Sequence, residues 1–134
     1  MIIIIKEEKL MKVLFWIVSI ALVTFEMVAG IGKQIGSKMA VESWINKMGM
    51  SKPLMSAFGG LEVGMIGIIL VSTFGTGSLG DFFDKLLPWA CLVLIVLKLI
   101  ELFLQRKANV EFASMVGPIV VIGLTIAFYF LRGL

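Results

Sequence analysis

The chain has 134 residues, 60% of them hydrophobic, a mean hydropathy of +1.08 and a formal net charge of +3. A soluble globular domain has about 45–50% apolar residues, so this composition excludes an ordinary soluble protein and predicts one embedded in the lipid bilayer. The lysines that give the positive charge flank apolar stretches, which is typical of headgroup contact, and we expect no nucleic-acid partner.

Four stretches are long enough to cross a bilayer, since a membrane-spanning helix needs roughly 20 predominantly apolar residues. They are Val13–Ile31, Leu54–Phe74, Phe83–Leu104 and Phe112–Leu131. These stretches predict an all-α fold, a transmembrane four-helix bundle that forms a single domain over residues 13–134. Residues 1–12 are too short to span and are expected to be a disordered or interfacial lead-in.

A cleaved signal peptide is the alternative for the first stretch, because it ends in the small residues of "MVAG", Met27–Gly30. Glu26 directly before this site fits cleavage poorly, so we expect a retained span. Met11 is an alternative translation start.

A short interfacial helix is predicted between the first two spans, in "GKQIGSKMAVESWINKMGMSKP". Ser37 is a candidate N-cap and Gly49 a candidate C-terminal stop. We expect Trp44 to lie at headgroup depth, on a partial apolar stripe. The other two connections are expected to be loops, Gly75–Asp84 and Gln105–Glu111.

The orientation in the membrane follows weakly from charge. Lysines and arginines number five on the side of the two termini (Lys6, Lys9, Lys12, Lys85 and Arg132) and six on the other (Lys33, Lys38, Lys47, Lys52, Arg106 and Lys107). These nearly equal counts do not separate the two orientations, and cytoplasmic termini in the cell membrane are our working hypothesis.

Several ionisable residues fall within or at the ends of the predicted spans, where an unpaired charge costs about 2.5–3.5 kcal/mol at the bilayer centre. We therefore expect them to face the bundle interior and pair. Glu26 and Lys33 are seven residues apart and share one helix face. Lys98 and Glu101 are three residues apart and are also neighbours on one face. Glu62 and Lys98 fall at comparable depths in antiparallel spans, which predicts an ion pair between them.

Glycines accompany Glu62 in "FGGLEVGMIG". Gly60 and Gly64 form a G-x-x-x-G motif around it, and Gly67 continues the row of small residues. Such a row lets another helix approach closely, so we expect these three glycines to pack against a neighbouring helix.

The order of these motifs resembles the DoxX and DoxX-like family of small four-helix membrane proteins. The resemblance rests on "AGIGK" (Ala29–Lys33), "MGM" (Met48–Met50), "FGGLEVGMIGIIL" (Phe58–Leu70) and "GPIVVIGLTIAFYFLR" (Gly117–Arg132). It implies that Lys33 and Glu62 are signature residues. Many relatives place a histidine near the end of the third helix, whereas this chain has none.

Three interpretations of the intramembrane charges remain open. They act as structural ion pairs, as a polar cavity for a cofactor or a partner's charged group, or as the carboxylate of a proton-coupled carrier. The absence of histidine removes the commonest metal ligand and general base, so we expect no metal site and no catalytic residue.

The resemblance implies a non-catalytic subunit or scaffold of a membrane complex, with a membrane or redox protein as partner and a quinone as the cofactor to consider. No cofactor site is evident from the residues, and a homo-oligomer is compatible with this hypothesis. A small proton-coupled transporter is the alternative.

Overall fold

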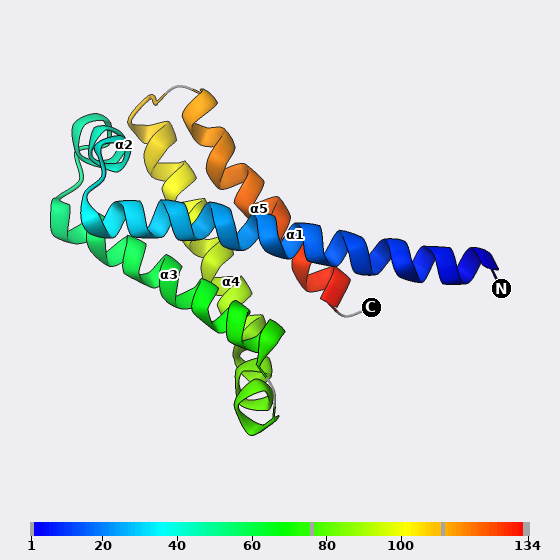
Figure 1. Ribbon diagram of the computed structural model, residues 1–134. Helices are drawn as coiled ribbons and strands as arrows, with labels where there is room; N and C mark the ends of the chain where they lie inside the picture. Colours follow the sequence, from blue (N-terminus) through cyan, green and yellow to red (C-terminus); the bar gives the residue numbers. More distant parts are fainter. Residues whose placement is uncertain (1, 76, 111, 133–134) are drawn as a thin grey trace.

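The computed structural model describes residues 2–75, 77–110 and 112–132, which form helices joined by short connections (Figure 1). The elements in chain order are α1 (Ile2–Ile35), α2 (Lys38–Ala40), the π-helical segment η1 (Val41–Lys47), α3 (Lys52–Phe74), α4 (Gly77–Lys107) and α5 (Phe112–Arg132). The predicted all-α bundle, with a short helix between its first two long helices, is confirmed.

Four helices are long and apolar enough to cross a membrane, over Lys6–Ile35, Lys52–Phe74, Gly77–Lys107 and Met115–Arg132. The chain is therefore a multi-pass membrane protein. The four long helices pack in a ring, in which α1 and α4 each contact both α3 and α5. Both ends of the described chain lie towards the same end of the bundle, and the start of α1 projects beyond its neighbours (Figure 1).

The apolar core lies where the four long helices meet. Each of them contributes a fully buried side chain, namely Leu22 from α1, Ile66 from α3, Leu94 from α4 and Phe128 from α5. Large apolar side chains also cover much of the outer surface, as a bilayer solvent allows.

Two expected boundaries differ from the structure. Of the residues expected to form a lead-in, 2–12 belong to α1, because "IIIIKEEKLMK" contains no glycine or proline that would end a helix, and residue 1 lies outside the described residues. The expected loop Gly75–Asp84 is mostly helix, since α4 already begins at Gly77. Gly77 has a φ of +67°, and this left-handed residue turns the chain within a few positions.

The segment between α1 and α3 begins and ends as expected. The backbone N–H of Ala40 donates a 3.3 Å hydrogen bond to Ser37 Oγ, and Gly49 adopts a φ of +70° after η1. Trp44 is only 2% exposed. The indole packs against Phe58 of α3, with ring centroids 4.8 Å apart, so it faces the bundle, and its expected depth at the headgroups stays a prediction.

The glycines that permit close helix packing are not those expected. No atom lies within 4 Å of a Cβ built on Gly64 or Gly67, and Gly60 meets only the Gln34 side chain, at 3.3 Å. Residues two positions from Glu62 lie about 200° around the helix, so Gly60 and Gly64 face away from the carboxylate.

The close approach is made instead by Gly59 of α3 and Gly30 of α1. A Cβ on Gly59 would lie 2.5 Å from Gly30 O, and one on Gly30 would lie 2.7 Å from a Val63 methyl carbon. Gly59 precedes Glu62 by three residues and shares its buried face. The α1–α3 contact therefore requires glycine at both positions.

We expect Gly59→Ala to destabilise the bundle by about 1–3 kcal/mol, because the added methyl group overlaps the α1 backbone. The measurement is the free energy of unfolding in mixed micelles titrated with dodecyl sulfate. Gly64→Ala is the matched control on the same helix and should leave stability unchanged or slightly raised. Equal losses for the two variants would contradict the Gly30–Gly59 contact.

Candidate functional site

Five charged side chains from three helices meet in one buried group, called here the charge cluster. Its members are Glu26 and Lys33 from α1, Glu62 from α3, and Lys98 and Glu101 from α4. None is more than 5% exposed. The structure thus brings together all of the charged residues that the sequence singled out.

Lys98 lies at the centre of the charge cluster. Its Nζ is 2.7 Å from Glu26 Oε1, 3.3 Å from Glu62 Oε1 and 3.2 Å from Glu101 Oε2. The expected ion pair between Glu62 and Lys98 is present. One ammonium group therefore links α4 to both α1 and α3.

Lys33 is the second cation of the cluster. Its ammonium group donates a hydrogen bond to Glu62 Oε1, and its Nζ lies 3.6 Å from Glu101 Oε1. The ammonium also lies over aromatic rings, 4.6 Å from the Trp44 centroid and 5.4 Å from the Phe58 centroid. Aromatic faces attract cations, so both rings help to hold this buried charge.

The position of Lys33 follows from local structure. The helix carries it seven residues beyond Glu26, on the same face, and the chain after α1 folds back so that Trp44 covers it. Sequence reasoning identified Lys33 but missed the aromatic cover. The only signal for it was a tryptophan in a short amphipathic segment, which is equally typical of an interfacial anchor.

The charge cluster is unbalanced, because three carboxylates face two ammonium groups and leave a formal charge of −1. Among the described residues, neither Glu26 Oε2 nor Glu62 Oε2 has a hydrogen-bond donor. Buried charges and unpaired buried oxygens are costly in a low dielectric, so the cluster can accept further positive charge or hydrogen-bond donors.

A pocket of about 490 Å³ borders the cluster, between α1, the α2–η1 segment and α4. Lys33, Glu101 and Gln105 line its polar wall, and Phe25, Val28 and Met39 are among its apolar lining residues. Gln105 was missed by sequence reasoning, which placed it in a loop. We call this feature the lateral pocket.

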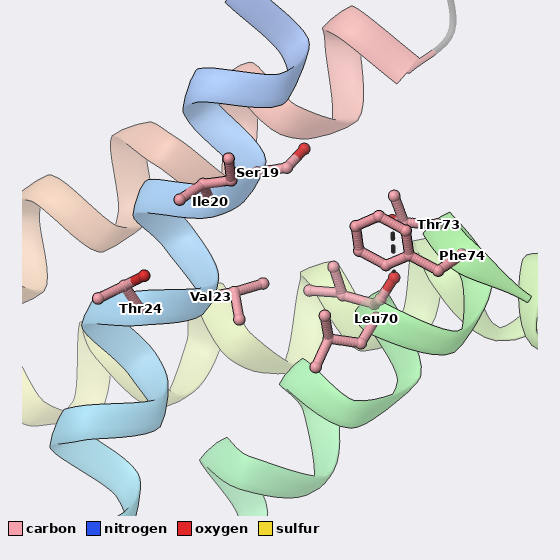
Figure 2. A pocket seen from close by; sticks show the side chains of 8 residues that line it. Ser19, Ile20, Val23, Thr24, Leu70, Thr73 and Phe74 are labelled. Carbon is pink, nitrogen blue, oxygen red and sulfur yellow. Dashed lines mark hydrogen bonds between the residues drawn. The ribbon is translucent and has the colours of Figure 1, made fainter.

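A smaller pocket of about 230 Å³ lies between α1 and α3 (Figure 2). Two of the hydroxyls in its lining are already engaged, since Ser19 donates to Phe15 O at 2.6 Å and Thr73 donates to Ile69 O at 2.8 Å. Figure 2 shows that aliphatic and aromatic side chains make up most of the lining. This groove suits a hydrocarbon chain rather than a polar group.

A second polar contact closes the opposite end of the bundle. Arg132 at the end of α5 pairs with Asp84 of α4 and donates a 3.0 Å hydrogen bond to the carbonyl oxygen of Ser72 in α3. The Ser72 hydroxyl also donates to Asp84. Sequence reasoning treated Arg132 and Asp84 as rim and loop residues and missed their pairing.

The cluster does not resemble a metal centre. Among the residues that the structure describes, no group of His, Cys, Asp and Glu has an arrangement able to hold a metal ion. The two lysines occupy the space between the glutamates, so the site is built for ion pairing and hydrogen bonding.

No protein-family model matches the chain, and comparisons with curated proteins and with solved structures also give no significant match. The fold and the site define the class: a four-helix multi-pass membrane protein with an ion-pair network inside the bundle.

We expect Lys98→Met to destabilise the protein by about 3–5 kcal/mol, because it leaves buried carboxylates without their shared cation. Glu62→Gln and Glu101→Gln should each cost less, because either one balances the charge of the cluster. Glu101→Gln should cost least, since its contact with Lys33 is 3.6 Å long whereas Glu62 accepts a hydrogen bond from Lys33. Unfolding free energies in mixed micelles test this order. If either glutamine variant is more damaging than Lys98→Met, the proposed role of the charge imbalance is wrong.

The contact between Arg132 and Asp84 should matter far less. Their side chains are 24% and 48% exposed, and partly exposed ion pairs contribute only about 0–1 kcal/mol. We therefore expect Arg132→Met to lower the thermal midpoint only slightly, with Lys107→Met as a surface control. A loss as large as that of Lys98→Met would show that this end carries a buried charge.

Proposed function

We propose that the protein is a non-catalytic subunit or scaffold of a membrane complex, of the DoxX-like type that the sequence motifs resemble. The observation that carries the proposal is the commitment of the five intramembrane charges to one another. Each lysine contacts at least two carboxylates from different helices, which is how buried ion pairs fix the arrangement of a bundle.

A scaffold of this kind takes its chemistry from a partner. The resemblance implies a quinone-linked redox complex, and in that setting the redox centre belongs to the partner protein. The rigid bundle then supplies a fixed docking surface within the cell membrane. Cytoplasmic termini remain our hypothesis for its orientation, and a homo-oligomer is one form that such a scaffold can take.

One observation favours a second candidate, a small proton-coupled transporter. The charge cluster has one carboxylate more than its lysines can neutralise, and Glu101 lines a pocket. Carriers use such a carboxylate to exchange a proton for a cation. Against this, Glu26 and Glu62 are fully buried and do not line the lateral pocket.

The two candidates differ in what Glu62→Gln changes. For a scaffold, co-purification from the native membrane in mild detergent should recover a stoichiometric partner, and Glu62→Gln should reduce its yield severalfold because the bundle loosens. Glu42→Gln, on the exposed surface of η1, is the control and should retain the partner. The readout is the partner-to-bait ratio by quantitative mass spectrometry.

For a carrier, the purified protein in liposomes should move a cation in exchange for protons with no partner present. Glu62→Gln should then keep its fold and abolish the coupling. Recovery of no partner, together with coupled transport by the wild type alone, would overturn the scaffold proposal.

A further inference from the structure

The lateral pocket has the shape of a site entered from the side of the bundle. Phe25, Val28 and Met39 line it and are 52%, 71% and 84% exposed. Phe25 and Val28 belong to the candidate membrane span of α1, where exposed apolar side chains face hydrocarbon. A molecule with an apolar tail can therefore reach the pocket from within the membrane.

The inner wall of the pocket is polar and touches the charge cluster. Lys33 is committed there to Glu62 and to the Trp44 ring. Glu101 is less saturated, because its Oε1 lies 3.6 Å from Lys33 Nζ, which is longer than a hydrogen bond. The pocket thus presents a carboxylate oxygen whose cation, Lys33, lies beyond hydrogen-bond distance. The side chains of Ser37 and Ser43 also line this pocket.

The charge of the cluster determines which headgroup fits. Three carboxylates and two lysines lack one positive charge, and Glu101 is the carboxylate of the cluster that lines the pocket. An anionic head would add to an existing negative charge in a low dielectric, and a neutral acceptor would meet a carboxylate. A cationic donor at Glu101 supplies the missing charge and pairs with the carboxylate that the pocket presents.

We propose that the lateral pocket binds a membrane-dissolved amphiphile with one ammonium head, which pairs with Glu101 while its tail leaves past Phe25 and Val28. The site is independent of the scaffold function, since it requires no partner protein. The ligand completes the charge balance of a cluster that is otherwise one cation short.

Four probes with similar apolar chains test the headgroup: dodecylamine, dodecyltrimethylammonium, dodecanol and decylubiquinone. The protein is placed in phosphatidylcholine nanodiscs. Trp44 lines the pocket and reports binding by its fluorescence in a Trp16→Phe, Trp89→Phe background. Both replaced rings lie on the outer surface, 45% and 67% exposed.

Dodecylamine should bind at least about tenfold more tightly than dodecanol, because a buried charge pair is lost with the alcohol. Dodecyltrimethylammonium should fall between them, since it carries the charge without a donor. Equal binding of the amine and the alcohol would overturn the proposal and indicate that a bound proton balances the cluster. Preferred binding of decylubiquinone would also overturn it.

Two variants and one control locate the site. Ala29→Phe fills the pocket and should abolish dodecylamine binding, whereas Ile31→Phe places the same ring on the exposed side of α1, outside the lining, and should not. Glu101→Gln should remove the preference for amine over alcohol while Trp44 fluorescence of the free protein stays native. Undiminished amine binding by a folded Ala29→Phe protein would show that the ligand sits elsewhere.

Discussion

The ion pairs of Lys98 are the interaction on which the rest of the structure depends. A charge in the membrane interior is tolerated only with a partner, and Lys98 finds its partners on two other helices. This requirement fixes the depth of α4 against α1 and α3 and the rotation of each about its axis. Apolar packing alone is less discriminating, because lipid is as apolar as the core and many rotations bury similar surface.

The bundle has polar contacts at two depths and an apolar core between them. The charge cluster lies towards the end where α1 meets the α2–η1 segment, and the contact of Arg132 with Asp84 lies towards the end with the termini. The first is buried and joins three helices, while the second is partly exposed. Function is therefore expected at the end where charge is desolvated and where the lateral pocket reaches it.

Much of this arrangement could be predicted from the sequence. The lengths of the apolar stretches predict the four spans. The cost of exposing a charge to lipid predicts that Glu26, Glu62 and Lys98 face the bundle interior. The packing glycines could not be assigned from spacing alone. A G-x-x-x-G motif indicates that small residues share one helix face, but it does not indicate which neighbouring helix that face contacts. Helix periodicity counted from Glu62 favours Gly59 only once the buried face of the helix is known. The contact of Trp44 with Lys33 could not be predicted, because a short amphipathic segment has the same pattern whether its tryptophan faces lipid headgroups or folds back over a lysine.

The helix α5 supplies none of the five charges of the cluster. Its attachment rests on apolar contacts such as those of Phe128 and on the partly exposed contact of Arg132. Buried ion pairs therefore join α1, α3 and α4, whereas α5 packs against them mainly through apolar side chains. Among the described residues, loosening of α5 from its neighbours would separate no buried ion pair, so this helix is expected to be the first of the four to detach when the bundle is perturbed.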